Sequence, residues 1–215
     1  MKIRSAFTLS EVLITLTIIG VIAAITMPIL VQSYQKQVLT NRLRKSYSLV
    51  SQAFQKMMHD DGAVVFSETK YYKSRYTHDG FDTCMSKYVN VFRREYVETG
   101  DNNYLNLDKT PVTDELKSRL YLVDGTILFE NGNNFFIDVN GEAGPNVMDR
   151  DLFKFTISSD GGLTPYVYSG GVVGYEKDEF GNDDMSKPIF GDPDNCTTSG
   201  CGAARIIKAG WKMNY

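Results

Sequence analysis

The sequence predicts an α+β fold in which one long N-terminal helix packs on a C-terminal antiparallel β-sheet domain. An apolar run of about 25 residues starts at Phe7 and passes into a segment with apolar residues at helical spacing. Short apolar segments separated by Gly-containing turns follow from Leu120, as in a β-meander. Four parts are therefore expected: a short basic segment at 1–6, the apolar and amphipathic halves of the helix at 7–31 and 32–58, and a globular domain at 59–215.

The apolar run from Phe7 to Val31 is long enough to cross a hydrocarbon layer of about 30 Å as a helix. It is longer than the apolar core of a secretory signal, which has about 7 to 15 residues. The run therefore predicts a single membrane span. Cleavage as an ordinary signal near Ala23 and Ala24 is the alternative. Basic residues flank the run on both sides, so charge alone leaves its orientation open.

The amphipathic half of the helix is expected to pack beneath the globular domain. Its apolar residues recur at helical spacing from Tyr34 to Met57, with Lys and Arg on the other face. Beyond it, short helices are expected around Asp82–Arg94 and Thr113–Leu120. Strands are expected at 120–123, 126–130, 135–139, 152–157 and 163–168, an irregular loop at 169–202, and a final helix at Ala203–Ala209.

Length and charge limit the class of protein. The 215 residues leave about 180 outside one span, which suffices for one domain with its own core. The formal net charge of −3 gives no overall basic excess for tracking nucleic acid, so nucleic-acid binding is not expected.

One acid, Glu11, stands inside the apolar run. A carboxylate in a membrane span is costly and calls for a partner or a role. Lys2 and Arg4 precede it, Phe7-Thr8-Leu9-Ser10 leads directly into it, and Pro28 follows seventeen residues later. This combination resembles the leader of type IV prepilins and type II secretion pseudopilins, although that family usually has Gly where this chain has Ala6, and Ile or Val where it has Ser10.

The resemblance implies a pilin-like fold and a processing pathway. A prepilin peptidase/methyltransferase would cut between Ala6 and Phe7 and methylate the new Phe7 amine. Glu11 and Pro28 would then serve assembly. In a filament of staggered helices, the Glu11 carboxylate of one subunit could pair with the Phe7 amine of a neighbour and set the axial register.

The same resemblance implies location and partners. The chain would be a single-pass protein of the inner membrane with an extracytoplasmic globular domain, and would later enter a type IV pilus or a periplasmic type II secretion pseudopilus. Its partners would be other pilin or pseudopilin subunits, the peptidase and an inner-membrane assembly platform. The alternative is a membrane-anchored extracytoplasmic binding domain that does not polymerise.

The sequence gives no sign of enzymatic chemistry. The motifs HExxH, GxSxG and GxxxxGK[ST] do not occur, and the two histidines, His59 and His78, lack a metal-ligand spacing. We therefore expect a structural protein that is not an enzyme and needs no cofactor.

Calcium is the one metal considered, because it takes six to eight oxygen ligands. A count from Asp138 places Ala143 where an EF-hand loop requires Gly, and Asp or Asn in turns usually caps backbone N–H groups instead. Backbone capping is therefore preferred to calcium binding. The candidate ligands are Asp138, Asn140, Glu142, Asp149 and Asp151.

Three cysteines would meet an oxidising compartment if the domain is translocated, so one disulfide and one free thiol are expected. The Cys196–Cys201 pair closes a small loop at little entropic cost and is preferred. Cys84–Cys201 is the second choice, and three free thiols would suit a domain that stays in the cytoplasm.

Overall fold

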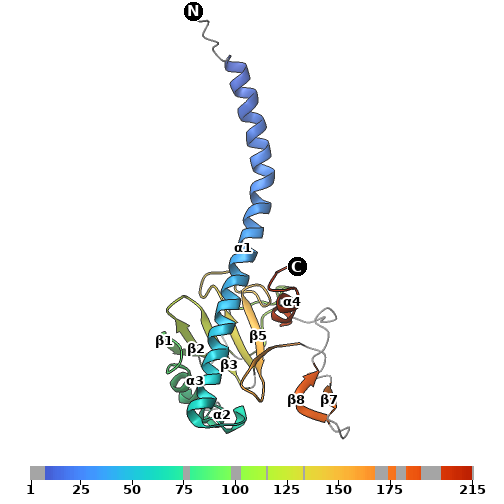
Figure 1. Cartoon of the computed structure of the whole chain (residues 1–215). Coiled ribbons are helices and arrows are strands. Elements are labelled where there is room, and N and C mark those ends of the chain that lie inside the picture. The colour runs from blue at the N-terminus through green and yellow to red at the C-terminus, as the bar shows by residue number, and fades with distance from the viewer. Residues whose placement is uncertain are drawn as a thin grey trace, which may run out of the picture. The chain divides into compact units, whose positions relative to one another are not determined.

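In the computed structural model of the chain, the residues described are 8–74, 78–97, 103–114, 116–132, 134–167, 174–177, 183–189 and 200–214. The chain divides into two units, Met1–Val38 and Leu39–Tyr215. Helix α1 (Leu9–Asp61) begins in the first unit and continues into the second (Figure 1). The α+β class is confirmed: an N-terminal apolar helix packs against an antiparallel sheet through its C-terminal half.

Helix α1 ends three residues beyond the predicted position 58. Gly62 has a φ of +62°, a conformation that glycine adopts without a Cβ penalty. The N–H of Gly62 donates to the His59 carbonyl at 3.1 Å, and the N–H of Ala63 donates to the Met58 carbonyl at 2.9 Å. This pair of bonds is a Schellman cap, which satisfies carbonyls left open at a helix end.

The sheet of the second unit has six strands in the order β1-β2-β3-β4-β5-β6, so every strand pairs with its sequence neighbours, and all pairs are antiparallel. Three short helical elements, which precede the sheet, are η1 (Phe66–Glu68), α2 (Lys70–Ser74) and α3 (His78–Met85). The strands are β1 (Val91–Tyr96), β2 (Ser118–Leu122), β3 (Ile127–Asn131), β4 (Asn134–Asp138), β5 (Leu152–Ile157) and β6 (Leu163–Pro165).

Alternate side chains of the sheet enter two separate cores, because successive residues of a strand point to opposite faces. On β4, Phe135 and Ile137 join the larger core with Phe54 of α1, whereas Phe136 joins the smaller one. The larger core is made by α1, the short helices, α4 (Gly202–Lys208) and one face of the sheet. On the other face, the 104–116 segment and Met148 cover the smaller core.

The second half of α1 packs as its spacing predicts. Leu43, Val50, Phe54 and Met57 are buried in the larger core, and each lies three, four or seven residues from the next. The ring of Phe54 lies 5.5 Å from that of Phe135 of β4, centroid to centroid, in an edge-to-face arrangement. This contact joins the helix to the middle of the sheet.

The five strands predicted from Leu120 onward correspond to β2 to β6; β5 has the predicted bounds, and the other four have shifted ends. The helix predicted around Asp82–Arg94 is wrong over most of its length. Only α3 (His78–Met85) is helical there, and residues 91–94 belong to strand β1. Strand β1 lies at the sheet edge and is exposed on both faces, so it has no alternating pattern to reveal it. The helix expected at Thr113–Leu120 is also wrong, since β2 starts at Ser118.

The segment expected to be irregular, 169–202, contains a second, two-stranded sheet made of β7 (Gly174–Lys177) and β8 (Asp183–Ile189). The final helix, expected at Ala203–Ala209, is α4, shifted by one residue. Beyond α4, Trp211 packs against the larger core and contacts Tyr47 of α1, their ring centroids 5.5 Å apart. Tyr215 lies outside the described residues.

Candidate functional site

The first candidate site is the start of α1. Ala6 and Phe7, the predicted processing residues, lie outside the described residues. Thr8 stands immediately before the helix, and its backbone N–H and its hydroxyl each donate to the Glu11 carboxylate at 2.8 Å. The Glu11 N–H approaches the Thr8 hydroxyl in return, at 3.3 Å. This reciprocal arrangement is a capping box, which satisfies N–H groups left open at a helix start.

The segment from Leu9 to Val31 is apolar and exposed, apart from the half-buried Ala23. By length and composition, α1 could cross a membrane. Three of its threonine hydroxyls form hydrogen bonds within the helix. The hydroxyls of Thr15, Thr17 and Thr26 donate to backbone carbonyls three or four residues earlier, at 2.8 to 2.9 Å. The segment therefore presents almost no unsatisfied polar group to lipid or to neighbouring helices.

Pro28 lies inside α1, and the helix continues on both sides of it. Proline has no N–H, so the carbonyl four residues earlier, that of Ala24, loses its usual helical donor. The predicted assembly roles of Glu11 and Pro28 concern contacts between subunits and stay predictions.

The five calcium candidates lie near the turns after β4 and before β5, but their carboxylates are used separately. Asp138 is fully buried. One of its carboxylate oxygens accepts hydrogen bonds from the N–H groups of Asn140 and Gly141, at 3.0 and 2.8 Å. The other oxygen accepts a hydrogen bond from the Tyr104 hydroxyl at 2.5 Å. Burial raises the pKa of Asp138 to about 7, although these three donors oppose the change.

Asp151 and Asp149 hold two other stretches of backbone. Asp151 accepts the N–H groups of Asn146 and Val147, at 2.8 and 2.5 Å. Asp149 accepts those of Gly200 and Gly202, both at 2.7 Å, and so ties its turn to the start of α4. Burial raises the pKa of both carboxyls.

The two remaining candidates also have local partners. Glu142 forms an ion pair with Arg93 of β1, and the Asn140 amide donates to the carbonyls of Ala143 and Gly144. In the part of the chain that the structure describes, no three His, Cys, Asp or Glu side chains form a group that could hold a metal ion. The carboxylates of Asp138, Asp149 and Asp151 cap backbone N–H groups, and calcium binding stays an untested alternative.

The cysteines differ in state. Cys84 in α3 is a free thiol, whereas Cys201, at the start of α4, is disulfide-bonded. The second-choice pair, Cys84–Cys201, is therefore wrong, because Cys84 packs against the larger core and keeps its thiol. Cys196 lies outside the described residues, so its pairing with Cys201 stays a prediction.

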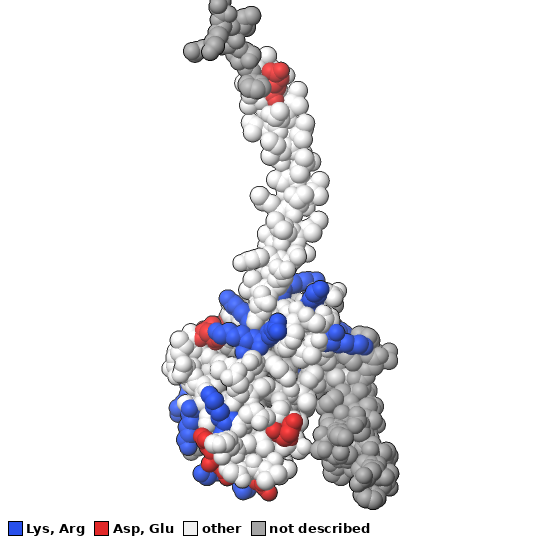
Figure 2. All heavy atoms as spheres, viewed as in Figure 1, with Lys and Arg blue, Asp and Glu red and all other residues white. Residues whose placement is uncertain are grey.

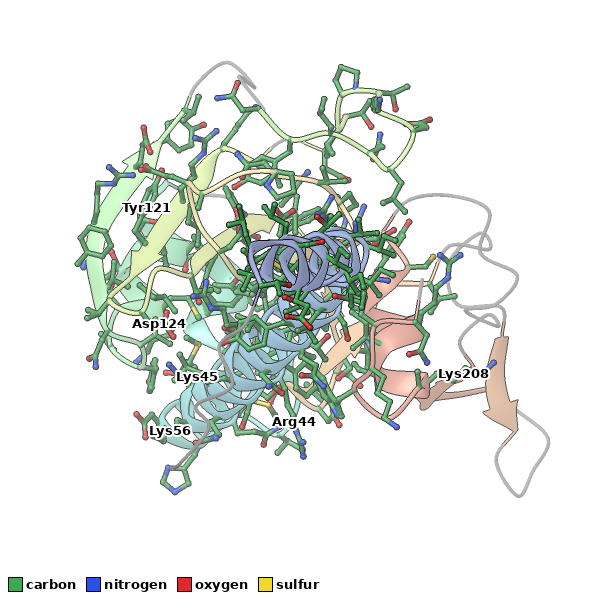
Figure 3. All side chains as sticks on the ribbon, turned by 90° about the horizontal axis from the view of Figure 1, so that it is seen from above. Arg44, Lys45, Lys56, Tyr121, Asp124 and Lys208 are labelled. Carbon is green, nitrogen blue, oxygen red and sulfur yellow. The ribbon has the colours of Figure 1, made fainter. Side chains whose placement is uncertain are left out.

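Sequence reasoning missed a polar pocket of about 320 Å³ beside the smaller core. The Arg93 guanidinium lies 3.6 Å from the centre of the Tyr121 ring, and the Tyr121 hydroxyl donates to Glu95 at 2.6 Å. Figure 3 labels Tyr121 at this edge of the sheet. No local motif predicts the pocket, because its walls come from distant segments. Its lining residues are Arg93, Glu95, Asn103, Tyr104, Arg119, Tyr121, Ile127, Phe129, Glu142 and Asn146.

Comparisons with known proteins agree with the N-terminal features. Residues 1–27 match the prokaryotic N-terminal methylation motif, the signature of type IV pilins and pseudopilins. Residues 29–214 match a family described as a family of unknown function, DUF6613. No curated protein and no solved structure matches the chain. The chain thus belongs to the DUF6613 family and carries a pilin-type methylation motif at its N-terminus.

Proposed function

We propose that this protein is a structural subunit, a pilin or pseudopilin, of a type IV pilus or a type II secretion pseudopilus. The precursor is inserted in the inner membrane with its globular domain outside the cytoplasm. The peptidase removes residues 1–6 and methylates Phe7, and α1 then carries the subunit into the filament. One observation supports this proposal most: the methylation motif leads directly into a helix whose apolar side chains are exposed from Leu9 to Val31.

Exposed apolar side chains on all sides of a helix need an apolar environment. Lipid supplies it before assembly, and the helices of neighbouring subunits would supply it in a filament. The internally bonded threonines suit both environments, since neither supplies water to a hydroxyl.

The test is the intact mass of the membrane-extracted protein after co-expression with a prepilin peptidase. We expect loss of Met1 to Ala6 and addition of one methyl group. The Ala6→Gly variant supplies the residue usual in this family and should be cut at least as completely, whereas Ala6→Leu should be cut poorly. A mature N-terminus near residue 25 would instead identify an ordinary secreted protein.

The second candidate is a membrane-anchored extracytoplasmic binding domain that does not polymerise. The polar pocket that Arg93 and Tyr121 help to line favours it, because arginine, carboxylate and aromatic groups converge there. Such a protein would keep its leader in the co-expression experiment and would remain in membranes when filaments are sheared off.

A further inference from the structure

Two segments of the chain contain basic residues and no acid. The first is α1 from Val12 to His59, and the second is the C-terminal stretch from Gly200 onward. The whole chain has 23 Lys and Arg against 26 Asp and Glu, so this separation of charge is not a general basic excess.

The structure brings cations of both segments to one part of the second unit. The Arg44 guanidinium of α1 lies 5.8 Å from the centre of the Trp211 ring, and Trp211 packs edge-on against Tyr47 of α1. In Figure 2, Lys and Arg side chains gather on the globular unit around the first turns of α1 that belong to it. Figure 3 labels Arg44 and Lys45 on this part of α1. We call this the basic surface, made by Arg42, Arg44, Lys45 and Lys212 around Trp211.

The basic surface is accessible and keeps its positive charge. All of its Lys and Arg side chains are exposed. Lys45 pairs with Asp124 at 2.8 Å, which neutralises one cation. Arg42 donates to the Val139 carbonyl at 3.4 Å, an uncharged partner that leaves the guanidinium charge in place.

The sequence distance along α1 limits how far this surface can lie from a membrane. Arg42 and Lys45 follow Val31, the end of the predicted span, by 11 and 14 residues of unbroken helix. At a rise of 1.5 Å per residue, the backbones of Arg42 and Lys45 lie at most about 16 to 21 Å from that of Val31. This upper limit follows from the length of the chain alone. Helical side chains lean toward the N-terminus, and the Debye length is about 8 Å at physiological salt. The headgroup layer fills about 5 to 7 Å of that distance, and the long side chains of Arg42 and Lys45 lean across part of the rest, so their charges come within about one Debye length of the headgroups.

We propose that the basic surface binds the anionic phospholipid headgroups of the membrane that holds α1. The proposal rests on the membrane anchoring stated above and adds a specific lipid partner. Cations close to a span are attracted to anionic lipids, and the ring of Trp211 is of the kind that lies at membrane interfaces. The contact holds the globular unit against the bilayer before assembly, and leaving the membrane requires breaking it.

The chain contains one tryptophan, Trp211, and it lies within the basic surface, so its fluorescence reports the contact directly. The full chain is reconstituted in phosphatidylcholine vesicles with and without phosphatidylglycerol. A lipid with a nitroxide on its headgroup serves as the quencher. We expect stronger quenching in the anionic vesicles, and loss of the difference in 1 M salt, where the Debye length falls to about 3 Å.

The decisive variant reverses two charges of the basic surface, Arg42→Glu with Lys212→Glu, and leaves Arg44, which contacts the Trp211 ring, untouched. Each basic residue near an anionic surface strengthens the contact by roughly fivefold, so the double reversal should weaken lipid-dependent docking by tenfold or more. Lys56→Glu is the matched control: it reverses a charge on the same helix, outside the basic surface, and should behave as wild type. Lys56 follows Lys45 by 11 residues of α1, which is about 16 Å farther along the helix from the predicted span.

Several outcomes would overturn the proposal. Equal quenching in neutral and anionic vesicles would exclude a role for anionic lipid. If Lys56→Glu lost as much of the quenching in anionic vesicles as the double variant, the effect would come from net charge and not from a specific surface. Quenching in neutral vesicles that rises with protein density and is lost in salt would identify a second copy as the partner. Failure to resist an alkaline wash of the vesicles would contradict the membrane anchor itself, and so also the proposed function.

Discussion

The carboxylate of Glu11 accepts two hydrogen bonds from Thr8, one from its backbone N–H and one from its hydroxyl, both at 2.8 Å. Within a single chain, the acid of the apolar segment therefore already has a partner, and it serves as the cap of α1. Its local role and its proposed role in assembly can be separated by substitution, because only the second requires a negative charge.

Glu11→Gln should keep the cap and lose assembly. Glutamine accepts the same hydrogen bonds in a capping box, so the start of α1 should persist, while the charge that would pair with a neighbour's Phe7 amine is gone. We expect unchanged or improved membrane insertion and a sharp fall in the amount of subunit in sheared filaments, measured separately by immunoblot. Thr8→Val keeps the charge and should still assemble. A Glu11→Val protein that enters filaments as well as wild type would remove the assembly role.

Cys84 and Cys201 should respond differently to substitution. Cys201 is disulfide-bonded at the start of α4, so Cys201→Ala should lower the free energy of unfolding by about 2 kcal/mol, as expected for a small-loop disulfide. Cys84→Ala removes no crosslink and should cost less. Non-reducing peptide mapping should recover Cys84 as a free thiol and Cys196 linked to Cys201. Three free thiols would contradict the prediction.

Asp138 should make stability depend on pH. Its pKa is raised by burial to about 7, against about 3.9 in an unfolded chain, so between these values the folded state binds more protons than the unfolded state. The free energy of unfolding should therefore fall as pH rises from about 4 to about 7, by at most about 1.4 kcal/mol per pH unit for this group.

Asp138→Asn should flatten that pH dependence in urea unfolding of the full chain in detergent. Asp160→Asn is the control, because hydrogen bonds from Ser158 and from the Gly162 N–H hold the Asp160 pKa below its usual range. Removal of the Asp160 carboxylate should leave the dependence of the free energy of unfolding on pH, between about pH 4 and pH 7, unchanged. An unaltered slope in Asp138→Asn would show that another carboxyl, such as the buried Asp149 or Asp151, dominates.

Phe135→Ala should destabilise the globular unit strongly. The side chain is fully buried, and its ring centroid lies 5.5 Å from that of Phe54 and 5.9 Å from that of Phe81. Truncation of such a residue costs about 3 to 5 kcal/mol, measurable as a shift in the urea midpoint. Phe92→Ala on the edge strand β1 removes an exposed ring and should change stability far less. Equal losses would contradict the assignment of the larger core.

The amino-acid sequence alone determined the features that depend on local pattern. The apolar run, its continuation at helical spacing and the alternating segments from Leu120 predicted α1 and strands β2 to β6, because burial on one face imposes a period that is visible within a few residues. The leader features from Lys2 to Glu11 predicted the methylation motif that the family comparison finds. The capping box of Thr8 and Glu11 also has a spacing that is visible in the sequence, a threonine followed three residues later by a glutamate.

Only the tertiary structure decided the features that depend on distant residues. Strand β1 exists because its edge position supplies hydrogen bonds from β2, without any buried face. Asp138, Asp149 and Asp151 lie close in sequence, yet each turns to different N–H groups, and those of Asp149 are about fifty residues away. The basic surface likewise joins Arg44 to Trp211 across most of the chain. Local spacing cannot encode such contacts, since packing of the whole sheet and helix decides which side chains meet.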